Sequence, residues 1–298
     1  MQHSDPSPPA AVAAAISPSR GGVISRFAPS PTGRLHLGHA YSAARAHAAG
    51  DRFLVRIEDL DGTRSRPEFV DGIFEDLRWL GLDWDEPVVV QSQRSQAYAD
   101  ALDELRDQRL VYPCFCTRAD IAAALEAPHG AAAHYPGTCR GLRDDPGRRA
   151  ATPHSWRLDV AKALERASLP SWTETGGARF ASSRSDLDDV ILARKEAPAA
   201  YHLACVVDDA ASGVTLVVRA ADLRSSTPIQ RLLQLLLGLP EPEYLHHPIV
   251  AHADGRRLAK RDLAPTLAAM RERGVDGRHV AGDIAAGKLP LGFTMIDP

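Results

Sequence analysis

The sequence predicts an α/β fold in which a parallel sheet is interrupted by an irregular insertion. Residues 23–61 contain two β-prone runs separated by a Gly- and Pro-bearing loop and an Ala-rich helical segment, which is the pattern of a βαβ unit and hence of parallel strands. Alternating strand and helix patterns return after residue 191, beyond an irregular stretch. The chain has 298 residues, of which 44% are hydrophobic, so it is long enough to bury a substantial core.

The spacing of apolar residues predicts the elements of the first half. The turn PSPTG closes the first strand, and the following RLHLGHAYSAARAHAA has the Ala, Leu and Arg content of a helix. Phe53, Val55 and Ile57 alternate with other residues, as in a strand. Two further amphipathic helices are predicted at residues 67–82 and 92–110.

These patterns divide the chain into five parts. We expect residues 1–22 to be a disordered extension, because they are rich in Pro, Ser and Ala and lack the positive start of a signal peptide. The other parts are the first half of the sheet domain at 23–112, the insertion at 113–190, the second half at 191–265 and a short helical C-terminal segment at 266–298. In the second half, IQRLLQLLLGL is expected to be a helix and HHPIVAHA one short strand.

Composition excludes several classes of protein. No apolar run approaches the roughly 20 residues that a membrane span needs, so we expect no membrane segment. The formal charge of -3 gives no global basic field, which does not exclude an RNA substrate because a local Arg stripe is invisible in the sum. Without a secretory signal, the four cysteines are expected to be thiols or metal ligands, with Cys205 a small buried hydrophobe.

The sharpest motif is PSPTGRLHLGH, at residues 29–39. His36 and His39 are expected on one face of the first turn of a helix that follows a strand and a Gly-bearing loop. The N–H groups and positive dipole of such a helix end favour a phosphate, to which both imidazoles can donate. Gly38 has no Cβ and therefore allows a flat ring to approach the backbone. The alternative is an ordinary surface helix with two histidines.

A second candidate is the loop ADGRRLAKRDLAP, at residues 253–265. The chain has only four lysines, and Lys260 in this Gly- and Arg-rich loop is placed to bring a cation to a triphosphate. The alternative is a solvated basic loop.

Three cysteines form a candidate zinc site. Cys114 and Cys116 are separated by one residue and Cys139 follows them, whereas structural zinc takes four ligands in a closed tetrahedron. On chemistry alone the fourth ligand is His134 or His129, because a neutral imidazole binds zinc more readily than a phenol. The alternative is three buried thiols without a metal.

Several segments together resemble a known family. The sequence HLGH at residues 36–39 resembles the HIGH signature of class I aminoacyl-tRNA synthetases, and RLAKR at 257–261 resembles their KMSKS loop. RFAPSPTGRLHLGHA, RIEDLD, VVDDAASGVTLVVRAADL and STPIQ are similar to the glutamyl branch. The chain is most similar to the short glutamyl-Q tRNA(Asp) synthetases, because residues 266–298 leave no room after the loop for an anticodon-binding domain. The resemblance implies a class I Rossmann-like catalytic sheet.

The same resemblance implies the activity of an ATP-dependent ligase. It implies that L-glutamate is activated by ATP with Mg²⁺ in the absence of tRNA, and that the glutamyl group is then transferred to queuosine in the anticodon of tRNA(Asp). We expect a cytoplasmic monomer with one structural Zn²⁺. The alternatives are a truncated glutamyl-tRNA synthetase that charges a tRNA 3′ end, another HxGH nucleotidylyltransferase, and a non-catalytic binding protein.

The resemblance also assigns roles to individual residues. The glutamate pocket is implied to contain Arg26, Phe27, Ala28, Pro29, Ser30, Glu58, Tyr201 and Arg219. Arg26 would meet a carboxylate and Glu58 the ammonium group, while the assignment of each Arg to a particular carboxylate stays open. ATP binding is assigned to His36, Gly38, His39, Arg257 and Lys260, with His36, His39 and Lys260 catalytic. The zinc ligands are Cys114, Cys116, Tyr135 and Cys139, so the family pattern favours Tyr135 over His134.

The KMSKS-like loop departs from the usual pattern at three positions. Arg257 replaces the first Lys, Ala259 the first Ser and Arg261 the last Ser. Arg keeps the positive charge, whereas Ala259 lacks a hydroxyl that could help to order the loop. We expect activity to survive through Lys260.

Overall fold

Five parallel strands form the central sheet of the protein. A computed structural model describes residues 22–117, 119–121, 135–195, 197, 199–256, 258 and 265–297. The strand order is β10-β9-β1-β2-β3, with β1 at Ile24–Phe27, β2 at Arg52–Ile57, β3 at Asp85–Val90, β9 at Leu216–Ala220 and β10 at Glu243–His247. The predicted parallel sheet is therefore confirmed.

In the first βαβ unit, alternate side chains of β1 and β2 point to opposite faces of the central sheet. Helix α1, at Leu37–Ala49, connects β1 to the neighbouring parallel strand β2. Phe27, Val55 and Ile57 belong to the core that includes α1, as their alternation with polar neighbours requires. Arg26, next to Phe27, and Arg56, between Val55 and Ile57, therefore point to the opposite face of the sheet and are buried there.

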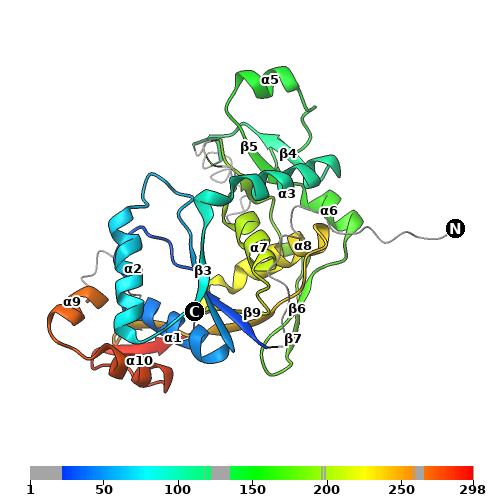
Figure 1. Cartoon of the computed structure of the whole chain (residues 1–298). Helices are drawn as coiled ribbons and strands as arrows, with labels where there is room; N and C mark the ends of the chain where they lie inside the picture. Colours follow the sequence, from blue (N-terminus) through cyan, green and yellow to red (C-terminus); the bar gives the residue numbers. More distant parts are fainter. Residues whose placement is uncertain are drawn as a thin grey trace.

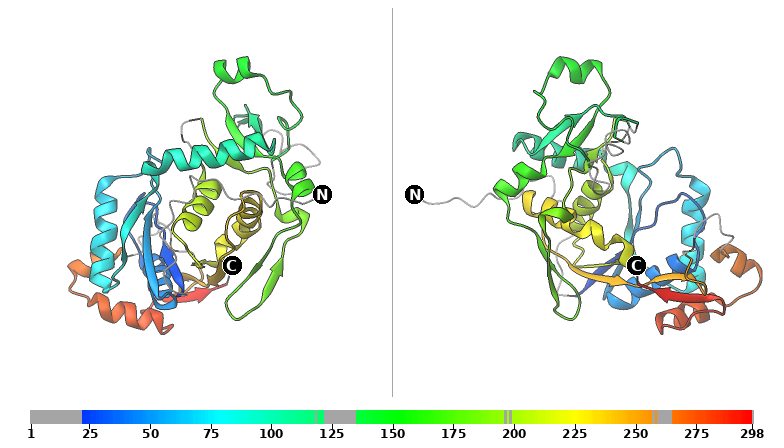
Figure 2. Two further views of the ribbon diagram at one scale, coloured as in Figure 1. Left: turned by 45° about the vertical axis from the view of Figure 1, so that its right-hand side comes forward. Right: turned by 180° about the vertical axis from the view of Figure 1, so that it is seen from behind.

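Helices cover both faces of the sheet, as parallel sheets require. On one face α1 packs with α2 (Pro67–Leu80) and α10 (Gly277–Ala285). On the other face lie α3 (Ser95–Asp107), α7 (Tyr201–Ala211) and α8 (Thr227–Leu236). Figure 2 shows α2 and the pair α7 and α8 on opposite sides of the strands. The predicted helix 92–110 begins as an α-helix only at Ser95, after the 3-10 helix η1 at Gln91–Arg94.

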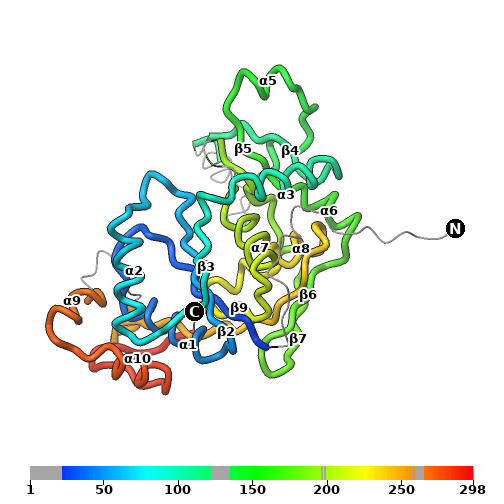
Figure 3. Tube along the Cα trace, viewed as in Figure 1, coloured from blue at the N-terminus to red at the C-terminus, as the bar shows by residue number. Residues whose placement is uncertain are grey.

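The insertion forms a second sheet together with the residues that flank it at 111–112 and 191–193. Strands β4 (Val111–Cys114), β5 (Ser155–Leu158) and β8 (Ile191–Ala193) form an antiparallel sheet. The short helices α5 (Pro146–Ala151) and α6 (Val160–Arg166) and the 3-10 helix η2 (Arg184–Asp186) belong to the same region. A hairpin of β6 (Ser171–Thr173) and β7 (Arg179–Ala181) leaves it and runs back to the side of the central sheet, as the tube in Figure 3 shows.

The C-terminal segment, predicted to be helical, contains two helices and also a strand. Helix α9 (Leu267–Glu272) and α10 pack against α1 and α2, in orange at the left of Figure 1. Strand β12 (Phe293–Ile296) then pairs with β11 (Ile249–His252), so the purely helical expectation was incomplete. The single predicted strand HHPIVAHA is also split, because Pro248 lacks an N–H and separates β10 from β11.

The described helices include none that is both long and apolar enough to cross a bilayer. The expectations for residues 1–21, His134, Arg257 and Lys260 fall outside the described residues.

Candidate active site

A cavity of about 590 Å³ opens at the carboxyl ends of the central strands. This is the position where parallel α/β sheets bind ligands. Its lining includes all the residues implied for the glutamate pocket and the three described residues implied for ATP: Arg26, Phe27, Ala28, Pro29, Ser30, Glu58, Tyr201 and Arg219, with His36, Gly38 and His39. Residues of strands β1 and β9, of helices α1 and α7 and of the loops that follow β1 and β2 thus meet at one site, although they are far apart in the sequence.

The two histidines of the HLGH motif cap helix α1. His36 is the N-cap residue, one position before the first turn, and its Nδ1 accepts a hydrogen bond from Gly38 N at 3.1 Å. His39 Nδ1 accepts from His36 N at 3.2 Å, and the ring centroids are 3.9 Å apart. Because both Nδ1 atoms accept backbone N–H groups, each neutral ring carries its proton on Nε2. Both rings are therefore prepared to act as donors at the positive end of the helix.

Gly38 makes room for the first of these rings. A Cβ at this position would lie 3.1 Å from His36 Cε1, closer than side chains normally tolerate. The glycine thus allows the imidazole of the N-cap residue to fold back over the helix end, in addition to any approach by a ligand.

Arg26 is buried and already bound to a carboxylate of the protein. Its Nε donates to Asp209 Oδ1 at 3.0 Å and its Nη2 to Oδ2 at 3.3 Å. Arg56, also buried, donates to the same Asp209 Oδ1 and holds Glu58 Oε1 at 3.0 Å through Nη2. Asp209 on α7 therefore joins the guanidinium groups of β1 and β2, and Arg56 orients Glu58 toward the cavity.

Burial and neighbouring charges act in opposite directions on these carboxyl groups. Burial would raise the pKa of Asp209, but the two guanidinium groups outweigh it, so the pKa lies well below its usual range. For Glu58 burial is the larger effect and raises the pKa despite Arg56. A bound ammonium group would favour the ionised form of Glu58 again.

Arg219 differs from Arg26 in its partners. It is only 5% exposed, and its donors go to neutral acceptors: Nε to His246 Nε2 at 3.2 Å, Nη1 to Gln230 Oε1 at 2.6 Å and Nη2 to Thr227 Oγ1 at 2.8 Å. No Asp or Glu in the described parts of the chain forms an ion pair with it. A buried cation without a counter-ion is unfavourable, so this position favours an anionic ligand.

Tyr201 begins α7 at the cavity, with 36% of its surface exposed. About two turns further along the same helix, Asp208 accepts from Tyr98 Oη at 2.7 Å and from Gln91 Nε2 at 3.0 Å. The hydrogen bond from Tyr98 fixes α7 against α3. The two acidic residues of VVDD therefore have different tasks, since Asp208 holds the helices together and Asp209 holds the arginines.

The three cysteines implied as zinc ligands converge in the insertion. The sulfur atoms of Cys114, Cys116 and Cys139 lie within 4.8 Å of one another, a group that could hold a metal ion. The Tyr135 hydroxyl lies 3.3 Å from Cys114 Sγ and 3.4 Å from Cys116 Sγ. In a tetrahedral zinc site neighbouring ligand atoms are about 3–4 Å apart, so this donor set fits the size of the ion. His134 lies outside the described residues.

A family comparison identifies the chain. Residues 22–280 match the family described as tRNA synthetases class I (E and Q), catalytic domain. The chain belongs to this family. It is accordingly an ATP-dependent ligase of the synthetase type, whose substrates include ATP, glutamate and tRNA.

Curated relatives of this synthetase carry a more specific name. A glutamyl-Q tRNA(Asp) synthetase from Rhodobacter capsulatus is 46% identical over 85% of this chain and 96% of its own length. One of the same name from Nocardia farcinica is 48% identical over 89% of this chain and 84% of its own. The resemblance inferred from the motifs is thereby confirmed.

Solved structures support the fold of the synthetase. A glutamate-tRNA synthetase from Elizabethkingia anophelis has a TM-score of 0.75 and 26% identity, and a glutamate tRNA ligase from Elizabethkingia meningosepticum in complex with its amino acid has 0.73 and 26%. They cover 89% and 88% of this chain. The synthetase spans about three fifths of the length of these two structures, at 61% and 60%.

Several residues of the synthetase site are given no role by the sequence motifs, among them two buried charged residues and one pair of polar side chains. Arg56 and Asp209 lie inside quoted motifs, and a charged residue within an apolar strand or helix is the signal that could have found them. Ser42 and His247 also line the cavity, with Ser42 Oγ at 3.0 Å from His247 Nε2. Nothing in the local sequence indicates that this second pair would meet.

Proposed function

We propose that this synthetase activates L-glutamate with ATP and transfers the glutamyl group to queuosine in the anticodon of tRNA(Asp). The proposal is supported by the names of the relatives and by the composition of the cavity. The observation that carries it is the contrast between the two arginines, since Arg26 has an internal carboxylate partner and Arg219 has none among the described residues.

The amino acid would bind through opposite charges. Arg219 uses three of its five N–H donors on His246, Gln230 and Thr227, which leaves two for a substrate carboxylate. Glu58, held by Arg56, would accept the ammonium group, and the remaining N–H donors of Arg26 would face the second carboxylate. A dicarboxylic amino acid needs this combination of two cationic groups and one anionic group.

The nucleotide would lie beside the start of α1. A glutamate carboxylate oxygen attacks the α-phosphorus of ATP, forming glutamyl-adenylate and releasing pyrophosphate. The Nε2–H groups of His36 and His39 would donate to phosphate oxygens as negative charge builds up in the transition state. Lys260 and Arg257, outside the described residues, are proposed to neutralise the pyrophosphate, and Mg²⁺ bound with ATP would supply further positive charge. A hydroxyl of the queuosine cyclopentenediol then attacks the glutamyl carbonyl and releases AMP.

The insertion would hold a structural zinc ion. We propose Cys114, Cys116, Tyr135 and Cys139 as its ligands, because all four side chains meet within contact distance. Such an ion would fasten β4 to the segment around residue 139 and take no part in the reaction.

The activation step is tested by ATP–pyrophosphate exchange with purified enzyme in the absence of tRNA. We expect exchange with glutamate and none with glutamine or aspartate. Exchange that requires tRNA would favour an ordinary glutamyl-tRNA synthetase core, and the absence of exchange with any amino acid would reject the proposal.

A further inference from the structure

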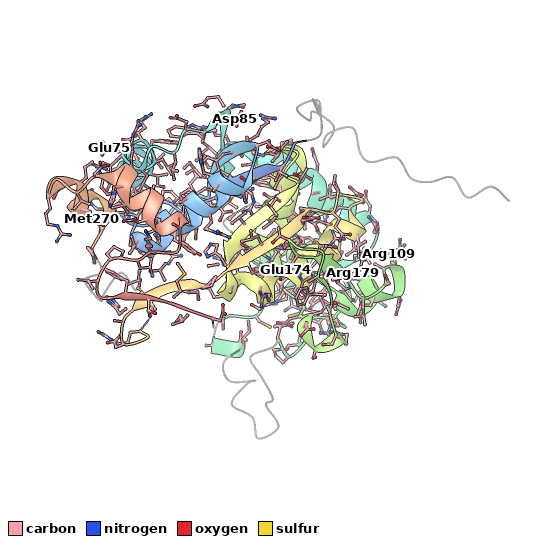
Figure 4. The ribbon with its side chains drawn as sticks, turned by 90° about the horizontal axis from the view of Figure 1, so that it is seen from below. Glu75, Asp85, Arg109, Glu174, Arg179 and Met270 are labelled. Carbon is pink, nitrogen blue, oxygen red and sulfur yellow. The ribbon has the colours of Figure 1, made fainter. Side chains whose placement is uncertain are left out.

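The β6–β7 hairpin docks against the edge of the central sheet. Thr175 N, in the turn of the hairpin, donates to the carbonyl of Tyr244 on β10 at 2.9 Å. Trp172 of β6 packs in a small core with Tyr244 and Val217. Figure 4 shows Glu174 and Arg179, on the two arms of the hairpin, close together beside the strands. The insertion therefore reaches the strands that carry the amino-acid pocket.

From this hairpin a chain of hydrogen bonds leads to the pocket. Glu174 Oε1 lies 2.8 Å from His246 Nδ1, and His246 Nε2 lies 3.2 Å from Arg219 Nε. The side chain of His246 is fully shielded from solvent, and that of Glu174 is 13% exposed. Since a carboxylate only accepts, Nδ1 carries the proton, and Nε2 must accept from the guanidinium, which only donates. Each bond in the chain thus fixes the direction of the next.

The surroundings keep this imidazole neutral. Burial and the positive charge of Arg219 lower the pKa of His246 to about 4. A neutral ring is the form whose Nε2 can accept from Arg219. Thr227 and Gln230 hold the two terminal nitrogens of the guanidinium, so His246 provides the third fixed point that sets its plane.

We propose that Glu174 and His246 are positioning residues that orient Arg219 for the substrate carboxylate. The inference rests on the proposed role of Arg219 in glutamate binding. It assigns the insertion a second task besides its metal site, because Glu174 belongs to the hairpin and reaches the pocket through one imidazole. Neither Glu174 nor His246 lines the cavity, so both act through Arg219.

Three variants distinguish whether Glu174 acts by positioning Arg219, through its negative charge or by holding the hairpin in place. Glu174→Ala removes the acceptor for His246, whereas Glu174→Gln keeps an acceptor oxygen and removes the charge. Arg224→Ala is the matched control, because Arg224 is half-exposed and contacts Glu174 Oε1 at 3.3 Å without lining the cavity. Glutamate-dependent exchange of the full-length enzyme gives KM for glutamate, KM for ATP and kcat, and thermal unfolding confirms that each variant is folded.

We expect Glu174→Ala to raise KM for glutamate about tenfold, the effect of misplacing one charge-assisted hydrogen bond, with KM for ATP unchanged. Glu174→Gln and Arg224→Ala should stay within about twofold of the wild type, because a partner remains in the first case and an exposed ion pair is lost in the second.

Three outcomes would contradict this. Loss of the negative charge alone would strengthen anion binding, so a lower KM for glutamate in Glu174→Ala overturns the inference. Equal values for Glu174→Ala and Arg224→Ala overturn it as well. A wild-type enzyme without glutamate-dependent exchange rejects the proposed function, and this inference with it.

Discussion

Two buried arginines on neighbouring parts of one sheet have opposite surroundings. Arg26 shares Asp209 with Arg56, whereas Arg219 is held by an imidazole, an amide and a hydroxyl. A buried ion pair that is complete contributes little to binding, but a buried cation that lacks an anion is prepared for one. At the scale of single residues, Arg219 is the cation whose charge has no carboxylate partner among the described residues, whereas Arg26 offers a substrate only the N–H donors that Asp209 leaves over.

The Arg26–Asp209–Arg56 cluster predicts a large loss of stability when its carboxylate is neutralised. Asp209→Asn should lower the free energy of unfolding by about 3–5 kcal/mol, because Arg26 would lose its carboxylate partner and the two buried guanidinium groups would repel each other with only Glu58 left beside Arg56. Urea denaturation measures the change. Asp144→Asn, which weakens an exposed pair with Arg149, is the control and should leave the midpoint unchanged. Equal stability of both variants would contradict the account of this cluster.

The lowered pKa of His246 predicts how stability depends on pH. Its pKa is about 4 in the folded protein and about 6.5 in an unfolded chain, so the unfolded state binds more protons between these values. The contribution to stability is complete above pH 6.5 and is lost as the pH falls toward 4, by up to about 1.4 kcal/mol per pH unit.

Urea denaturation at pH 7 and pH 5 tests this dependence. His246→Gln should reduce the difference between the two unfolding free energies without abolishing it, because burial and Arg219 also lower the pKa of His202 to about 4. An undiminished difference in the variant would show that His246 does not titrate as described.

The sequence indicates half of the residues that line the cavity but not their partners. HLGH, RFAPS and RIED name side chains that do meet there. The bond between Arg26 and Asp209 joins positions 183 residues apart, and the one between Glu174 and His246 joins positions 72 apart. A single sequence shows that such residues are charged but contains no information on which of them pair.

At the scale of elements, the start of α1 combines a structural task with a proposed catalytic one. His36 caps the helix through Nδ1, and its Nε2 is the proposed phosphate donor. His36→Asn should preserve the cap and the free energy of unfolding, because Asn is among the best N-cap residues. It should reduce glutamate-dependent exchange by about 100-fold, as expected for the loss of one donor to the transition state. Exchange within a few-fold of the wild type would contradict the catalytic role.

The cluster of Cys114, Cys116 and Cys139 brings β4 next to a distant segment of the insertion, and the proposed fourth zinc ligand can be tested. The wild type should contain about one zinc per chain, as for a structural site, and Tyr135→Phe should contain less. Metal analysis of the purified proteins measures this. His134→Ala serves as the matched variant and should keep its zinc. Undiminished zinc in Tyr135→Phe would exclude Tyr135 as a ligand.

Periodicity predicted the long elements better than the short ones. The βαβ unit and α2 follow from apolar spacing that repeats over several turns or residues. The strand β12 has only four residues, FTMI, and forms because it pairs with β11. The break between β10 and β11 follows from Pro248, which a reading of apolar content alone overlooks.

At the scale of the whole molecule, the insertion extends from the cysteine cluster at one end to the edge of the catalytic sheet at the other. Figure 1 shows β4, beside the cysteine cluster, at the top and the β6–β7 hairpin at the lower right. The first end carries the proposed zinc site, and the second contacts the strand next to Arg219. One inserted region thus supports both its own fold and the pocket.

The central claim concerns where the glutamyl group goes. The measurement is incubation of the enzyme with labelled glutamate, ATP and tRNA(Asp), with and without queuosine, followed by nuclease digestion and mapping of the label. We expect label on the queuosine nucleoside of the anticodon and none on tRNA that lacks queuosine. Label on the 3′-terminal adenosine, or equal labelling of both tRNA preparations, would contradict the account.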